Sequence, residues 1–120
     1  MAEYRQYITQ VLENGNVMIS EDVIASIITE TVSEVEGIDS IAVKSVSEFA
    51  DLIGMNWGKG MKISIGEDNS ITIDCNVIVK FGQSVIDVAT NAQQAITNAV
   101  EGIAGVKVNN VNVNVCGIAR

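Results

Sequence analysis

The sequence offers few groups for nucleophilic or metal chemistry. It contains two cysteines, Cys75 and Cys116, and no histidine. A nucleophile would therefore need a lysine or a carboxylate as its base, and none stands beside a serine or cysteine in a recognisable spacing. Without histidine and without a C-x-x-C pair, a zinc site is not indicated. We therefore expect no catalytic residue, no metal and no cofactor.

The two cysteines are expected to differ in exposure. Cys75 lies in the apolar phase of its segment and should behave as a small hydrophobic residue, whereas Cys116 ends the last apolar segment and should be more exposed. A disulfide between them is not indicated for a protein of the cytosol.

Paired carboxylates are a second source of chemistry, because two acids with separated pKa values can act as acid and base. Asp74 could pair with Glu67 or Asp68, which lie in a turn just before it. The sequence gives no reason for a shifted pKa at any of them. We therefore interpret all three as solvated charges.

The segment Gly54–Gly60 is rich in glycine and holds the only tryptophan, Trp57, beside Lys59. One interpretation is an anion-binding loop with Lys59 as its charge, but the spacing of a phosphate-binding loop is missing and a strand follows it. A second is a loop in which Trp57 covers one end of the core. A third is a partner-binding surface anchored by Trp57.

Regular elements must position these groups. Residues 71–81 alternate between apolar and polar side chains, which predicts a strand with one dry face. Residues 84–101 repeat apolar residues at helical spacing, with Ser84 as N-cap and Gly102 and Gly105 as stops. Residues 106–115 predict a last strand with a bulge or bend at Asn109-Asn110.

Earlier segments complete a two-layer α+β sandwich, in the order β-α-(β)-β-β-α-β, with two helices on one face of a small mixed or antiparallel sheet. Residues 1–14 form an N-terminal extension, a strand or a short helix, and Asn14-Gly15 favours a hairpin. Residues 15–118 form the single domain. It holds a helix from Ser20 to Gly37, a short strand at 38–43, helical turns at 47–53, and a strand at 61–65 that turns at 66–70.

The polar side of this sheet is the candidate interaction surface. It gathers side chains that are polar but mostly uncharged around one apolar residue: Ser64, Thr72, Asn76, Ile78, Asn112 and Asn114. Such a face can be simply solvated. The alternative is a wet protein–protein interface, for which the low charge is the compositional hint.

Composition limits the class of partner. The 120 residues carry a net charge of −8 with scattered basic residues, which argues against binding nucleic acid or anionic lipid. The sequence has no apolar run long enough to span a bilayer and no signal peptide, so we expect a cytoplasmic protein without direct membrane insertion.

Several short motifs follow one another along the chain in a set order: Ile19-Ser20-Glu21-Asp22-Val23-Ile24, Val35-Glu36-Gly37-Ile38, Asn56-Trp57-Gly58-Lys59-Gly60-Met61-Lys62, Val79-Lys80-Phe81-Gly82, Val111-Asn112-Val113-Asn114-Val115 and Gly117-Ile118. In their order and spacing they resemble the motifs of the alkaline shock protein family, the Gram-positive general-stress and envelope-stress-response proteins. The likeness covers about residues 15–118. It departs at Ile86, where many relatives carry proline.

The resemblance implies a small cytoplasmic α+β protein without catalytic residues. Some relatives sit at the membrane through a membrane-anchored relative. The first hypothesis is therefore a protein-interaction module of the envelope stress response, acting by self-association or by binding such a relative. It would use Thr72, Asn76, Ile78, Asn112 and Asn114, or the loop with Trp57 and Lys59. The second is a regulator of fatty-acid or acetyl-CoA carboxylase metabolism that binds an enzyme or an acyl ligand. The third is an enzyme.

Overall fold

The computed structural model describes residues 7–42 and 60–120. Its elements are β1 (Tyr7–Leu12), β2 (Gly15–Ser20), α1 (Glu21–Ser33), β3 (Ile38–Ile41), β4 (Met61–Ile65), β5 (Ile71–Lys80), α3 (Val85–Ala104) and β6 (Val108–Ala119). The helical turns expected at 47–53, and the loop with Trp57 and Lys59, lie outside the described residues.

The strand β5 is the centre of a four-stranded mixed sheet. β6 runs parallel to it along its whole length, with Cys75 opposite Val113. β3 and β4 run antiparallel to β5 at opposite ends of it, β4 opposite residues 71–75 and β3 opposite residues 77–79. Because β6 occupies one edge of β5, β3 and β4 share the other edge, one after the other.

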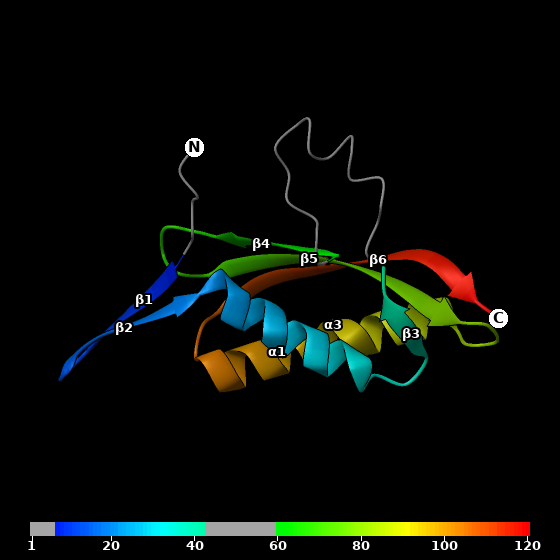
Figure 1. The fold of residues 1–120 in the computed structure, drawn as a ribbon, viewed down its shortest axis with the longest axis horizontal. Helices are drawn as coiled ribbons and strands as arrows, with labels where there is room; N and C mark the ends of the chain where they lie inside the picture. The colour runs from blue at the N-terminus through cyan, green and yellow to red at the C-terminus, as the bar shows by residue number, and fades with distance from the viewer. Residues whose placement is uncertain (1–6, 43–59) are drawn as a thin grey trace, which may run out of the picture.

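Both helices cover one face of this sheet, as Figure 1 shows. The alternation of apolar and polar residues in β5 gives the sheet a buried face toward the helices. Every second residue from Ile71 to Val79 is buried, and the intervening ones are half-buried. Ile96 from α3 and Ile24 and Ile28 from α1 are fully buried against it. The two-layer α+β sandwich with both helices on one face is therefore confirmed.

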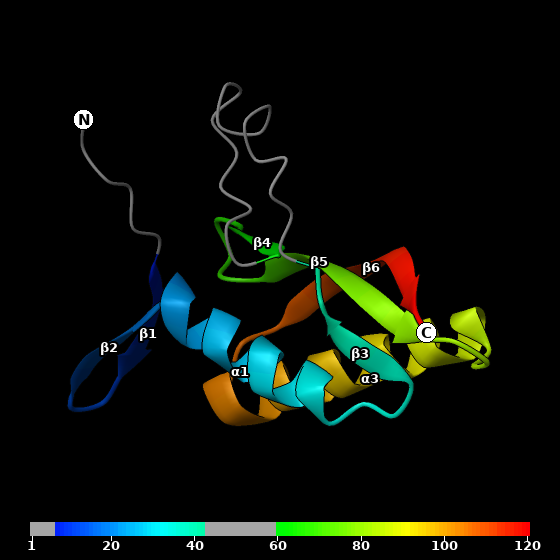
Figure 2. The same ribbon diagram turned by 45° about the vertical axis from the view of Figure 1, so that its right-hand side comes forward.

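The strands β1 and β2 form a separate hairpin that projects from one end of the body (Figures 1 and 2). Ile8 pairs with Ile19 at its base, and Ile8 is fully buried in the core. Asn69 Nδ2 donates to the carbonyl of Thr9 over 2.9 Å, which ties the hairpin to the β4–β5 turn. The predicted hairpin is confirmed, with residues 13 and 14 as its two-residue loop.

Three details of the helices differ from the sequence interpretation. α1 ends at Ser33 with Glu34 as its C-cap, so the helix stops before Gly37. Ser84 caps α3 as expected, its hydroxyl accepting from the N–H of Asp87, but Gly102 lies inside the helix and does not end it. Gly105, at φ 73°, is the C-cap, where its left-handed backbone suits glycine. Ser20 is the N-cap of α1 but makes no side-chain capping hydrogen bond.

Candidate interaction surface

The face of the sheet opposite the helices carries most of the predicted interaction residues. Paired residues of neighbouring strands share a face, so the register determines which residues lie on this face. We call it the helix-free face because, of the described helices, neither α1 nor α3 covers it. Thr72, Asn76 and Ile78 come from β5, and Asn112 and Asn114 come from β6. The structure thus brings these five residues together. Lys62, Asp74 and Lys80 lie on the same face, so it also holds charges of both signs.

Side chains on this face are hydrogen-bonded across the β5–β6 pair. Asn112 Nδ2 donates to Asp74 Oδ1 over 2.8 Å, and Asn114 Nδ2 donates to Asn76 Oδ1 over 3.0 Å. Each bond joins residues that face each other in the strand register. The two bonds hold four side chains in a fixed row along the centre of the face.

Ile78 is the apolar residue of the helix-free face and is half-buried. It pairs with Gly117 of β6, and a side-chain carbon at Gly117 would lie 3.9 Å from Ile78 Cγ1. Gly117 therefore contributes no side chain to the β6 side of Ile78. An irregularity in β6 between Val115 and Gly117 accompanies this arrangement, and the exposed Cys116 lies there.

The two cysteines are placed as expected. Cys75 is fully buried, and burial raises the pKa of its thiol to about 11, with a smaller contribution from Cys116. A thiol with such a pKa stays protonated at neutral pH and is a poor nucleophile.

The acidic residues considered for acid–base chemistry are engaged separately. Asp74 accepts from Asn112 on the helix-free face. Asp68 accepts from the hydroxyl of Ser70 over 2.6 Å and from its N–H over 3.2 Å in the β4–β5 turn. These bonds lower the pKa of Asp68. Among residues 7–42 and 60–120, no three His, Cys, Asp or Glu side chains gather as a metal site would require.

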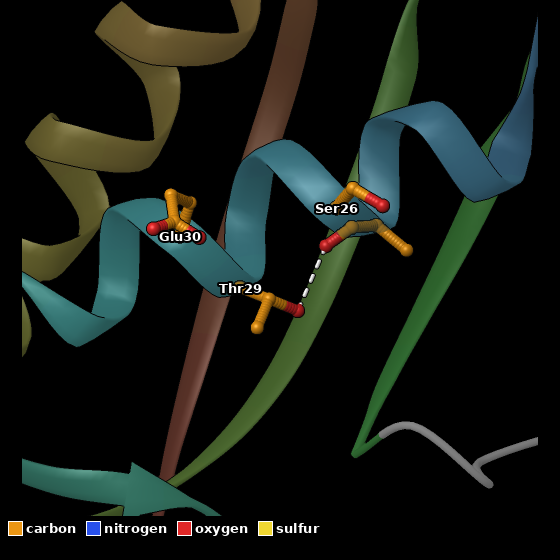
Figure 3. Close-up of a pocket in the computed structure, with 4 residues that line it drawn as sticks. Ser26, Thr29 and Glu30 are labelled. Carbon is orange, nitrogen blue, oxygen red and sulfur yellow. Dashed lines mark hydrogen bonds between the residues drawn. The ribbon is translucent and has the colours of Figure 1, made fainter.

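A depression of about 320 Å³ lies on α1, lined by Ala25, Ser26, Thr29 and Glu30 (Figure 3). The Thr29 hydroxyl is turned back to the helix and donates to the carbonyl of Ala25 over 2.9 Å. The lining contains two hydroxyls and a carboxylate, which do not suit an acyl chain.

The sequence interpretation missed two side chains that reach the outer edge of β6. Gln93 Nε2 donates to the carbonyl of Val111 over 3.0 Å, and Glu101 accepts from the N–H of Val108 over 3.1 Å. Both residues lie on α3, outside its apolar repeat. Only the placement of α3 beside β6 reveals their partners, so no local pattern could have found them.

Within residues 7–42 and 60–120, neither helix has the length and apolar character of a membrane-spanning segment.

Comparisons with known proteins agree with the fold and extend the sequence resemblance. A Bacillus subtilis protein, the uncharacterised YqhY, is 31% identical over 105 residues, which cover 87% of this chain and 77% of the relative. A Streptococcus pyogenes protein, the uncharacterised Spy1535, is 32% identical over 104 residues, covering 87% and 79%. A solved MamM-CTD structure covers 81% of this chain and 98% of its own, with a TM-score of 0.50 and 15% identity, and this likeness shows the fold alone. The model of the alkaline shock protein 23 family, described as having a cell envelope-related function, matches residues 9–120, so this chain belongs to that family.

Proposed function

We propose that this chain is a non-enzymatic protein-interaction module of the cell-envelope stress response, and that it binds a protein partner through the helix-free face of its sheet. The family's cell envelope-related function supports the cellular setting. The surface chemistry supports the mode of action. The partner is a membrane-anchored relative or a second copy of the chain, and the former would hold this protein at the inner surface of the membrane.

The observation that carries the proposal is the row of preformed side-chain pairs beside Ile78. Ordering polar side chains on binding costs free energy, and that cost is smaller when the side chains are already held by one another. Asn76 and Asn114 use one donor and one acceptor in their mutual bond, so each amide has further hydrogen-bonding groups for a partner. The helix-free face can therefore offer directed hydrogen bonds around an apolar contact.

Ile78 supplies that apolar contact. A half-buried isoleucine whose β6 neighbour, Gly117, has no side chain can accept a partner side chain on that side. Interfaces commonly combine an apolar centre with a polar rim in this way. The row supports an interaction role, since its amides and one carboxylate are bonded to one another.

In-cell crosslinking with mass spectrometry tests the proposal. Wild type is compared with Ile78→Lys, which places a charge at the centre of the face, and with Asn98→Lys, which places the same charge on the exposed side of α3. We expect the yield of crosslinks to the main partner to fall at least fivefold in Ile78→Lys and to be unchanged in Asn98→Lys. Equal yields from all three proteins would contradict the proposal.

A further inference from the structure

Among the described residues, the outer edge of β6 is covered at its start and open afterwards. The side chains of Glu101 and Gln93 bond the backbone of Val108 and Val111, as a neighbouring strand would. Backbone groups of alternate residues point to the same edge of a strand, so Val113 and Val115 point outward like Val111. No residue of the described ranges 7–42 and 60–120 bonds these outward groups.

Free strand edges are normally blunted by charge, by proline, by a β-bulge or by a covering element, because an open edge pairs with another chain. The irregularity at Cys116 is a feature of this kind, and it divides the open edge into residues 112–115 and 117–119. The first part of β6 is covered by α3 side chains, but residues 112–119 contain no charged residue and no proline. In a chain with a net charge of −8, a long edge without charge is a surface at which a second, equally acidic molecule can approach.

Two exposed isoleucines, Ile86 and Ile118, form an apolar shelf next to the open part of this edge. Ile86 precedes Gln93 by two helical turns and so lies on the same side of α3, the side that faces the outer edge of β6. Its side chain is 73% exposed. Ile118, at the end of β6, is 52% exposed. A strand added beside β6 would bond Val113 and Val115 and rest alternate side chains on this shelf.

We infer that residues 112–119 of β6 pair antiparallel with the same residues of a second copy, which joins the two sheets across a two-fold axis. In a two-fold contact, the same surface of each copy meets its counterpart. Residues 112–119 can pair with the same residues of a second copy because they bring no like charges together. The bonds from Gln93 and Glu101 cover the edge as far as Val111, so the pairing begins beyond Val111. The two Ile86 side chains then lie on one side of the joined sheet.

This inference rests on the proposed function in that both treat the chain as a protein-binding module, but it uses the edge of the sheet and not the helix-free face. Residues of the face and of the edge can be changed separately. Ile78→Lys is expected to lower partner capture and to leave the edge contact between copies intact. Loss of one property without the other tells the two proposals apart.

Sedimentation velocity over a concentration series provides the test. Ile86→Glu adds a charge at the seam, and Ile103→Glu is its matched control because Ile103 is 71% exposed at the opposite end of the same helix. We expect wild type and Ile103→Glu to dimerise alike, and Ile86→Glu to dimerise at least tenfold more weakly. A wild type that is monomeric at every concentration overturns the inference, even if it binds an added strand peptide. A dimer that Ile86→Glu does not weaken overturns it as well.

A backbone variant and a thiol probe examine the seam itself. Val115→Pro removes an outward N–H that β5 does not use, and Val115→Ala keeps that N–H. We expect the proline variant to be monomeric and the alanine variant to be dimeric, while circular dichroism reports whether each is folded. Antiparallel pairing of 112–119 places the two Cys116 thiols within roughly 10 Å. A short bis-maleimide should join them in wild type and Ile103→Glu but not in Ile86→Glu, and a dimer that is never joined at Cys116 overturns β6 pairing.

Discussion

Asn114 Nδ2 donates a hydrogen bond to Asn76 Oδ1 over 3.0 Å, directly across the parallel pair of β5 and β6. Water replaces such a bond at little cost, because Asn114 is exposed. We expect Asn114→Ala to lower the free energy of unfolding by at most about 1 kcal/mol in urea titration. It should nevertheless reduce partner crosslinking severalfold, because Asn76 is then no longer held in place.

Asn98→Ala is the control for that prediction, since Asn98 is an exposed asparagine on α3, away from the helix-free face. It should change neither stability nor crosslinking beyond error. Equal crosslinking by Asn114→Ala and Asn98→Ala would show that the row of amides does not contribute to binding.

The buried thiol of Cys75 should make the protein less stable at alkaline pH. Burial raises its pKa from 9.0 to about 11, so an unfolded chain loses this proton at a lower pH than the folded one. The thiol therefore leaves stability unchanged below pH 9, and stability falls as pH rises from 9 to 11. The loss approaches roughly 2 to 3 kcal/mol, at 1.36 kcal/mol for each pKa unit.

Urea unfolding at pH 8, 9, 10 and 11 measures this loss. Cys75→Ala should show a shallower decline than wild type over that range, because it has no thiol to ionise on unfolding. Cys116→Ser, which changes the exposed cysteine, should follow wild type. Parallel curves for Cys75→Ala and wild type would contradict the assignment.

The sequence predicted the parts of the fold that depend on near neighbours. The alternation of β5 reports its own buried face, and Ser84 caps α3 through the residue three positions later. The bulge in β6 is confirmed too: Val108 faces Ile71 and Asn110 faces Thr72, which leaves Asn109 as the extra residue. Each of these features is set within a few residues of chain.

Features that depend on which elements become neighbours were not predictable in this way. The alternation of side chains in β6 places Asn112 and Asn114 on the helix-free face. Their bonds to Asp74 and Asn76, however, require β6 to pair parallel with β5 in one register. The hydrogen bonds that join Gln93 and Glu101 to the outer edge of β6 form only because α3 packs beside that strand. The sequence therefore identified the helix-free face but not the edge.

Gly37, in the connection between α1 and β3, should tolerate substitution poorly, because it lies against Val88 of α3. Its φ of 96° is unfavourable for other residues, and a side-chain carbon there would lie 2.6 Å from Cγ2 of Val88. Gly82 has a similar φ of 93° but nothing within 4 Å. We expect Gly82→Ala to cost about 1–2 kcal/mol from backbone strain alone, and Gly37→Ala to cost about 1–3 kcal/mol more from overpacking.

Thermal and urea unfolding of both variants measures the difference. A double-mutant cycle of Gly37→Ala with Val88→Ala isolates the steric part, because shortening Val88 makes room for the new methyl group. The cycle should give a favourable coupling energy. Equal losses in Gly37→Ala and Gly82→Ala would mean that the contact with Val88 relaxes freely.

Asp68 should titrate below its ordinary pKa of 3.8, because the Ser70 hydroxyl, and after it the Ser70 N–H, bond the charged carboxylate. A lowered pKa means that this turn stabilises the fold above pH 3.8 and loses that contribution as the pH falls toward the pKa of the folded state. The Ser70 hydroxyl is itself oriented by Asn109, whose Nδ2 donates to it over 2.7 Å. In an NMR pH titration, Ser70→Ala should raise the pKa of Asp68 toward its ordinary value, and Asn109→Ala should raise it by less, since the hydroxyl remains. A pKa of Asp68 that does not move in Ser70→Ala would show that the bond across the turn does not form in solution.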